Sequence, residues 1–400
     1  MKTFSFDIKH RDSNSLARTG TIHTPHGDIQ TPAFIPVGTK AAMKALTVDM
    51  MHSLGAQAVL ANAYHLFVQP GPALVEKAGG VSKFMSWGGP TYTDSGGFQV
   101  LSLGSGYKKV VSMVSDEATI AEKSTRKAFV DEDGVTFKSH RDGAIHRFTP
   151  EVSMEIQHGL GADICFAFDE LTSLADKPSY HREALDRTHR WAHRSLEHFR
   201  KLQNDNLDRP YQALFGVLQG ANIEELRRET AQYLGAMEFD GFGIGGAIEK
   251  SRLGEIVRWV CEELPEDKPR HLLGISEPSD IFAGVEAGAD TFDCVAPTRE
   301  ARNGAIYTLD GRYNLKAAKY REDLSPLQDD CTCHVCKTYT KAYIHHLFRS
   351  KEMLAATLAS YHNEHFILRL VDNIRESIER GEFAEYKQLM LERYRAQALK

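Results

Sequence analysis

The segment YQALFGVLQGANIEELRRETAQYLGAMEFDGFGIGG (residues 211–246) decides the fold of this chain. It contains two short apolar runs, at 211–220 and 241–246. Between them, at 223–237, apolar residues recur at spacings of three and four, which is typical of an amphipathic helix. The order of strand, helix and strand predicts a parallel βαβ unit.

The same pairing extends to both sides of this segment. Further apolar runs lie at 56–62, 162–170, 270–276 and 289–297, and further helical patterns lie at 183–202, 254–264 and 278–288. Each run is apolar almost throughout, as in strands that are buried on both faces. We therefore predict a parallel sheet with crossover helices.

Polar motifs mark the ends of these predicted strands. TDSGGFQ (93–99) follows one, and FDE (168–170), LQG (218–220), GG (245–246), GIS (274–276) and FDC (292–294) close five others. In a closed barrel all strand ends of one kind meet on one face, whereas an open sheet has a single crevice. Six motif-bearing ends favour an irregular (β/α)8 barrel of the α/β class.

We predict three regions along the chain. Residues 1–50 are expected to form antiparallel strands packed on the barrel, because TGTIHTPHGDIQTPAF (19–34) alternates polar and apolar residues. Residues 51–322 form the catalytic barrel, with a polar, weakly patterned and mobile insertion at about 105–132. Residues 323–400, which contain the cysteine-rich segment CTCHVC (331–336), are expected to form a zinc-binding subdomain and C-terminal helices.

The composition limits the class of protein. The 400 residues have 42% hydrophobic content and a net charge of -6, which supports a large core and argues against a uniform nucleic-acid coat. A local basic face stays possible. The N-terminus lacks an apolar signal segment, and no apolar stretch reaches roughly 18 residues. These features predict a soluble, cytoplasmic chain with no membrane partner.

Acidic side chains lie at or near the predicted strand ends. They are Asp94, Asp169, Glu170, Asp290 and Asp293. Taken singly, an aspartate at such a place is more often a helix cap or a loop acceptor. However, Ser-Gly-Gly after Asp94 lets the backbone approach a ligand, and Asp293 lies in an apolar setting. Two aspartates facing one pocket can divide nucleophile and proton-carrier roles at an acetal-like carbon such as a glycosidic C1′.

A cysteine cluster near the C-terminus predicts one structural zinc ion. Cys331, Cys333 and Cys336 with one histidine form a closed tetrahedral ligand set, which leaves no open position for catalysis. A catalytic-zinc hydrolase is therefore disfavoured. Spacing alone does not choose the histidine, and the candidates are His362, His334, His345 and His346.

These motifs together resemble the tRNA-guanine transglycosylase family, the queuine tRNA-ribosyltransferases, in its bacterial type. The resemblance runs in order through nearly the whole chain. It includes FIPVGTKAAMKALT (34–47), LANAYHL (60–66), TDSGGFQVLSLG (93–104), SMEIQHGLGADICFAFDE (153–170), TFDCVAPTREARNG (291–304), CTCHVC (331–336) and HN (362–363). The family fold is an irregular TIM barrel with a zinc-binding subdomain.

The resemblance implies roles for individual residues. Asp293 matches the nucleophile, Asp94 the general acid/base and His362 the zinc histidine. The base-binding set is Ser95, Gly96, Gly97, Phe98, Asp169, Gln219, Gly246 and Leu273. The tRNA-binding set is Gly274, Ile275, Ser276, Glu277, Pro278, Ser279, Asp280, Thr298, Arg299, Glu300, Ala301 and Arg302. Ordinary core packing of Phe98 and Leu273 is the alternative to base stacking.

The implied reaction is exchange of guanine at the anticodon wobble position, 34, for a 7-deazaguanine through a covalent ribosyl-aspartate. The implied partners are tRNA, the base (preQ1, which is 7-aminomethyl-7-deazaguanine, or queuine) and a second copy of the chain in a homodimer. Two alternatives remain. One is an N-glycosidase that hydrolyses the bond, and the other is a non-catalytic RNA-binding partner subunit, which the presence of both aspartates disfavours.

Three departures from the family pattern concern the choice of base. Leu171 follows FDE where bacterial members usually have cysteine. After Gly246 the family normally has Leu, then small residues, then Gly-Glu, whereas this chain has Ala247-Ile248-Glu249-Lys250 and is one residue shorter. The insertion at about 105–132 has no counterpart. Basic residues after the nucleophile are suited to gripping phosphates. They are Arg299, Arg302, Arg312, Lys316, Lys319 and Arg321.

Overall fold

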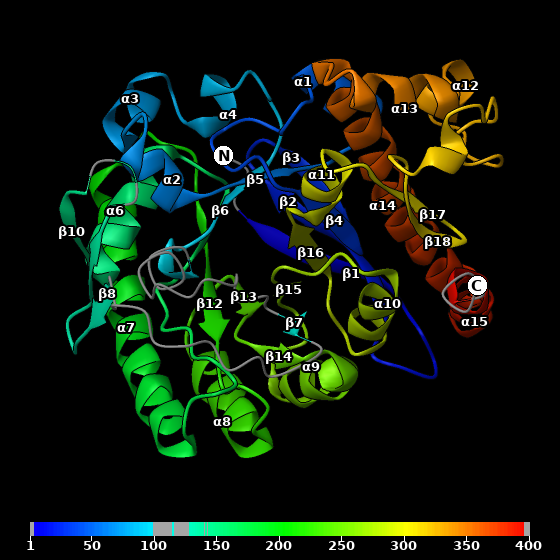
Figure 1. The fold of residues 1–400 in the computed structure, drawn as a ribbon. Helices are drawn as coiled ribbons and strands as arrows, with labels where there is room; N and C mark the ends of the chain where they lie inside the picture. Colours follow the sequence, from blue (N-terminus) through cyan, green and yellow to red (C-terminus); the bar gives the residue numbers. More distant parts are fainter. Residues whose placement is uncertain (1–3, 99–113, 116–127, 140, 142, 396–400) are drawn as a thin grey trace.

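A parallel eight-stranded barrel forms the centre of the molecule (Figure 1). The computed structural model describes residues 4–98, 114–115, 128–139, 141 and 143–395. The barrel order is β4-β16-β15-β13-β12-β11-β6-β5, and a parallel bridge from Val37 to Leu60 joins its two edges. The strands are β4 (Ala33–Pro36), β5 (Val59–Ala61), β6 (Thr91–Thr93), β11 (Ile164–Phe166), β12 (Ala213–Leu218), β13 (Gly241–Ile244), β15 (Arg270–Leu272) and β16 (Thr291–Cys294). The predicted (β/α) barrel is confirmed.

The helices between the strands cover the outside of the barrel. The predicted helices correspond to α7 (Pro178–Asp205), α8 (Glu224–Gly235), α9 (Leu253–Glu263) and α10 (Pro278–Glu286). The helices before them are α1 (Val48–Ser53), α2 (Ala63–Val68), α3 (Pro72–Lys77), α4 (Val81–Phe84) and α6 (Pro150–Leu160). Two short elements, β14 (Ile248–Glu249) and the 3-10 helix η1 (Lys250–Arg252), precede α9.

The N-terminal region is a three-stranded antiparallel sheet of β1 (Ser5–Arg11), β2 (Arg18–Thr24) and β3 (Gly27–Thr31). The next strand, β4, pairs in parallel with β16, so the barrel begins at Ala33 and not after residue 50. The run AFIP is buried throughout, as expected for an inner strand and not for an alternating surface hairpin. Ile22 and Ile29 pack with residues of the barrel interior.

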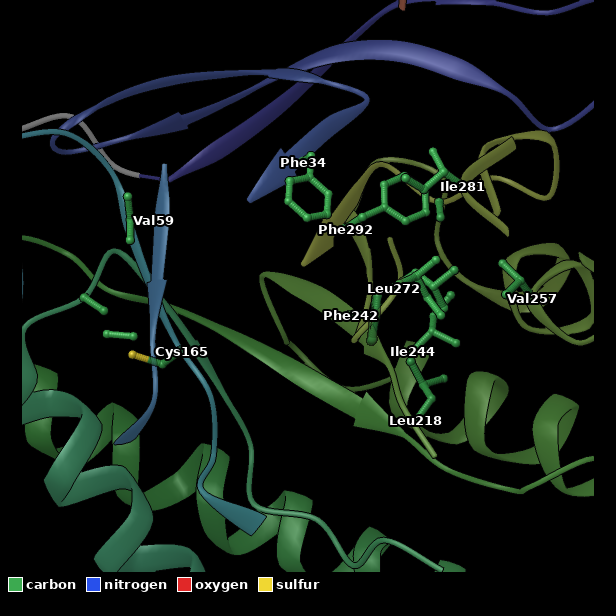
Figure 2. Packing of buried hydrophobic residues seen from close by; sticks show 14 of the residues in the cluster. Phe34, Val59, Cys165, Leu218, Phe242, Ile244, Val257, Leu272, Ile281 and Phe292 are labelled. Carbon is green, nitrogen blue, oxygen red and sulfur yellow. The ribbon is translucent and has the colours of Figure 1, made fainter. Parts of the chain in front are cut away.

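Alternation along each strand separates an outer from an inner layer. Phe34, Leu272 and Phe292 point outward and pack with Val257 and Ile281 of α9 and α10 (Figure 2). Their neighbours in sequence point into the barrel because successive side chains of a strand face opposite sides. The inner residues include Ile35, Phe166, Phe215 and Val217. Side chains just beyond this inner layer therefore converge at the carboxyl ends of the strands.

Part of the region predicted as an insertion has regular structure. β7 (Val114–Ser115) pairs in parallel with β14, and β8 (Ala128–Val130) joins β9 (Val135–Lys138) and β10 (Ile145–Phe148) in an antiparallel sheet. The remainder of 105–132 lies outside the described residues. The β7 pairing attaches this region to the loop at 247–250, which departs from the family pattern.

The C-terminal region begins with α11 (Ala296–Ala301) and the hairpin of β17 (Ala305–Thr308) and β18 (Gly311–Asn314). It continues with η2 (Ala318–Tyr320), α12 (His334–Thr338), α13 (Lys341–Arg349), α14 (Met353–Glu379) and α15 (Phe383–Arg395). The long helix α14 returns to the barrel and packs along β4 and β2. Among the described helices, none has both the length and the apolar character that a membrane span requires.

Candidate active site

A cavity of about 700 Å³ opens at the carboxyl ends of the barrel strands. Asp94 and Asp293 both line it, together with Asp169, Gln219 and Gly246. Its volume accommodates a purine and a ribose, and apolar walls with a few converging polar groups are typical of small-molecule sites. The two aspartates singled out from the sequence therefore face one shared space.

Asp293 extends from the end of β16, two residues beyond the inward-facing Thr291. Its Oδ1 accepts hydrogen bonds from the backbone N–H of Gly274 at 2.9 Å and from His271 Nε2 at 3.1 Å. Within the described part of the chain, Oδ2 has no hydrogen-bond partner. One oxygen is thus held in place, while the other stays available for a bond to a ligand.

His271, which the sequence did not single out, contacts Asp293. It is fully buried, and its Nδ1 lies 2.8 Å from the hydroxyl of Thr291. When that hydroxyl donates to Nδ1, Nε2 carries the proton and donates to Asp293. Inward alternation along 271–273 was a signal for this residue, because His271 shares the inner face with Leu273.

Asp94 follows β6 and is held by the start of α2. Its Oδ1 accepts from the backbone N–H of Ala63 at 2.8 Å, and its Oδ2 accepts a short hydrogen bond from Asn62 Nδ2. The glycine after Ser95 is required here. Gly96 has φ +79°, and a Cβ at this position would lie 3.0 Å from the Phe148 ring.

A third carboxylate, Asp169, is buried and lies just beyond the end of β11. Asp169 Oδ1 accepts from Ser95 Oγ at 3.1 Å, and Oδ2 accepts from Gln219 Nε2 at 2.6 Å. Burial raises the pKa of Asp169 to about 6, although the hydrogen bonds from Gln219 and Ser95 oppose this shift. Gln219 Oε1 is buried without a partner among the described residues. Asp169 and Gln219 thus form a polar edge of the cavity that can accept further hydrogen bonds, which suits a flat polar ligand.

The other predicted base-binding residues surround this edge. Phe98 and Leu273 line the cavity, as do Ser95, Gly96 and Gly246. Gly97 does not line it, but its N–H donates to Ser95 Oγ at 3.2 Å. A Cβ on Gly97 would lie 3.0 Å from the backbone oxygen of Asp169, so this position needs glycine.

The predicted tRNA-binding segments form the rim. The residues that line the cavity are Gly274, Ile275, Ser276, Glu277, Asp280, Arg299 and Glu300. Those outside the lining are Pro278, Ser279, Thr298, Ala301 and Arg302. Glu277 and Glu300 both pair with Arg312, at 2.5 and 3.1 Å. Arg299 and Arg302 are exposed and form no ion pair within the described ranges, so they remain available to phosphates.

Two of the residues that depart from the family pattern form part of the cavity wall. Leu171 and Lys250 both line it, and both are half-buried. Lys250 has no carboxylate partner among the residues that the structure describes. This wall thus combines an apolar side chain with an unpaired cation.

The cysteine cluster lies at the start of α12, away from the cavity lining. Cys331, Cys333, Cys336 and His362 place one ligand atom each within 4.8 Å of one another. The three sulfurs lie 3.3–3.8 Å from His362 Nδ1. Metal–ligand bonds of about 2.1–2.3 Å in a tetrahedron put ligand atoms roughly 3.5–3.8 Å apart, so the residues fit a metal ion.

The histidine is fixed by a second contact. His362 Nε2 lies 2.8 Å from the carbonyl oxygen of Tyr307, so this nitrogen donates and Nδ1 is left for a metal. The competing histidines lie elsewhere: His345 Nδ1 is bonded to the carbonyl of Leu315, and neither His334 nor His346 belongs to the cluster.

Comparison with known proteins agrees with this geometry. The family model for queuine tRNA-ribosyltransferase matches residues 12–396. A queuine tRNA-ribosyltransferase of Caldanaerobacter subterraneus subsp. tengcongensis is 43% identical over 397 residues, covering 98% of both chains. That of Roseiflexus sp. is 44% identical over 395 residues, covering 96% of this chain and 98% of the relative. The chain therefore belongs to the queuine tRNA-ribosyltransferase family.

Proposed function

We propose that this chain exchanges guanine at the wobble position, 34, of a tRNA for a 7-deazaguanine base, as a step of queuosine modification. The observation that carries this proposal is the shared cavity of Asp94 and Asp293 with the polar edge of Asp169, Gln219 and Gly246. The carboxylate of Asp169 accepts from the base N1–H and amino group, and amide donors bind O6.

The reaction proceeds in two displacements at the ribose C1′. Asp293 Oδ2 forms a bond to C1′ while the C1′–N9 bond breaks and its electron pair passes to guanine. Asp94, in its acid form, gives that base a proton. The incoming base then loses its N9 proton to the Asp94 carboxylate, its nitrogen bonds to C1′, and Asp293 is released.

The geometry supports this division of labour. Two hydrogen bonds hold Asp293 Oδ1 and orient Oδ2, whereas the amide of Asn62 and the backbone of Ala63 hold Asp94. Asp94 and Asp293 thus belong to different strands and have different partners, as expected of groups with different roles. The exposed Arg299 and Arg302 at the rim would bind phosphates of the anticodon loop, whose bases are readily unstacked.

Exchange of radiolabelled guanine into a tRNA transcript with guanine at position 34 tests the proposal. We expect incorporation of label, and a protein–RNA adduct that a second base resolves. An adduct resolved by water alone would instead identify an N-glycosidase. Absence of both adduct and exchange would favour a non-catalytic RNA-binding subunit.

We expect the choice of 7-deazaguanine to depend on the part of the cavity wall formed by Leu171 and by Lys250 of the 247–250 loop. Displacement of labelled guanine from tRNA, assayed with preQ1 and queuine separately, identifies the base. Displacement by queuine would support an altered specificity of this wall. Displacement by preQ1 alone would remove the case for it.

We further propose that the cluster of Cys331, Cys333, Cys336 and His362 holds one structural zinc ion, which cross-links α12 to α14.

A homodimer and a cytoplasmic location remain predictions. Exposed apolar side chains at α13 and the start of α14, including Tyr343, Met353 and Leu354, support a homodimer. Light scattering coupled to size-exclusion chromatography tests it.

A further inference from the structure

A buried arginine lies beneath the floor of the cavity, near the start of α8. The Arg227 side chain is fully buried. Its Nε donates to the carbonyl of Ala221 at 2.8 Å, and its Nη1 donates to those of Gly245 at 2.8 Å and Leu218 at 3.3 Å. Within the described residues, Arg227 forms no ion pair and its Nη2 has no partner.

A buried cation without a carboxylate partner is costly. Among the buried arginines of the described residues, Arg18 and Arg187 form ion pairs with Asp290 and Glu170, whereas Arg227 and Arg270 form none. Burial lowers the pKa of the Arg227 guanidinium to about 9, which still leaves it positively charged at neutral pH. Its charge is therefore available to a bound ligand.

Arg227 also determines the direction of a peptide group in the cavity floor. Its Nη1 binds the Gly245 carbonyl, and in a planar trans peptide the following N–H points the opposite way. The Gly246 N–H is therefore turned away from Arg227. Because Gly245 and Gly246 line the cavity, this N–H is directed into it.

The Arg227 guanidinium lies close to Gly246 in the cavity floor. A Cβ on Gly246 would lie 3.0 Å from Arg227 Nη2 and 2.7 Å from Gln219 Oε1, and Gly246 has φ +93°. A side chain at position 246 would thus insert between the cation and the polar edge. Glycine leaves the positive charge directly behind the donor group.

We propose that Arg227 is a positioning residue that aims the Gly246 amide at the 6-oxo group of the base and supplies positive potential there. This inference rests on the proposed function. When the C1′–N9 bond breaks, its electron pair enters the purine ring and conjugation places part of the charge on O6. The fixed cation stabilises that charge and transfers no proton.

The variants Arg227→Met and Arg227→Lys test the role of this cation. Arg228→Met is the matched control, because Arg228 follows directly on the same helix but pairs at the surface with Glu224, Glu262 and Glu263. We expect Arg227→Met to raise the KM for guanine and lower kcat, each by about tenfold. Arg227→Lys keeps the charge but cannot span three carbonyls, so we expect a smaller increase in KM. tRNA affinity by filter binding should change less than about twofold.

A base analogue separates this role from a general loss of packing. 6-Thioguanine keeps N1–H and the amino group but has a weaker acceptor at position 6. The preference for guanine over 6-thioguanine is measured as the ratio of the inhibition constant of 6-thioguanine to the KM for guanine. This ratio should fall in both Arg227 variants and should stay at the wild-type value in Arg228→Met. If Arg227→Met does not fold, Arg227→Lys alone decides. An unchanged guanine KM and an unchanged preference in folded variants would overturn the inference, whereas a wild type without exchange would overturn the proposed function.

Discussion

The cavity at the barrel face and the cysteine cluster at α12 differ in how far their polar groups are satisfied by other protein groups. In the cavity, Gln219 Oε1 has no partner within the described structure, and burial raises the pKa of Asp169. In the cluster, every ligand atom points inward, and the second nitrogen of His362 is bonded to a carbonyl. The cavity keeps hydrogen-bonding capacity for a ligand, whereas the four ligand atoms of the cluster fit a single metal ion.

This difference predicts different responses to substitution. Changes in the cavity should alter chemistry and leave the fold intact, because its residues lie at the ends of strands that other contacts hold. Changes in the cluster should alter the fold first, because binding of a structural metal is coupled to folding.

Replacing Asp293 by Asn should have the largest effect. An amide cannot form the ribosyl ester, so exchange should fall by roughly four orders of magnitude or more and the covalent adduct should disappear. Guanine exchange and adduct trapping on denaturing gels measure this. Metal content and Tm should match the wild type. Normal adduct yield in this variant would refute the nucleophile assignment.

Replacing Cys333 by Ser should have the largest effect on stability. Loss of one thiolate weakens the metal site, and because metal binding is coupled to folding the free energy of unfolding should fall by several kcal/mol, about 3 or more. Elemental analysis and thermal denaturation measure both consequences. The control is Cys261→Ser, a buried cysteine on α9 outside the cluster, which should keep its metal. Full metal content in Cys333→Ser would show that the ligand assignment is wrong.

Replacing His271 by Phe should have an intermediate effect on catalysis. The variant removes the donor to Asp293 Oδ1, so the carboxylate loses one of its two fixed contacts. We expect kcat to fall about 10- to 100-fold with little change in tRNA affinity. His271→Gln, which keeps a donor, should recover part of this loss. Equal kcat values for the Phe and Gln variants would show that His271 acts only through packing.

The sequence predicted those features that depend on local pattern. The apolar runs and helical spacing from 162 to 297 established the barrel, because each period is visible within one element. Cys331, Cys333 and Cys336 lie within six residues, so their spacing alone indicated a metal site. The motif at Asp94 likewise combines an acid with two glycines.

Features that depend on register across the barrel could not be predicted in this way. β4 reads as part of an N-terminal hairpin until its parallel pairing with β16 is known. His271 shares a face with Leu273, but its contact with Asp293 comes from the neighbouring strand, and no periodicity encodes it. Arg227 resembles any helix arginine in sequence, and only its complete burial distinguishes it from its half-buried neighbour Arg228.

The pH dependence of base binding should give the smallest effect and the sharpest contrast with the cluster. Asp169 must be a carboxylate to accept from the base, and its pKa in the folded protein is about 6. As pH falls from 7 to 5, the ionised fraction drops about tenfold, so the KM for guanine should rise by about the same factor. The pKa is raised above its ordinary value of 3.8, so protonation of Asp169 favours the folded chain as pH falls through 6. Weaker base binding at pH 5 would therefore not reflect unfolding caused by this residue.

The variant Asp169→Asn isolates this ionisation. An asparagine side chain has the same shape but does not titrate. The KM of this variant for guanine should therefore be higher than that of the wild type at pH 7, and it should not show the change near pH 6 that the wild-type KM shows. The measurement is guanine KM at half-unit steps from pH 5 to 8, with tRNA affinity measured in parallel. A wild-type KM that does not change across this range would show that Asp169 does not titrate between pH 5 and 8.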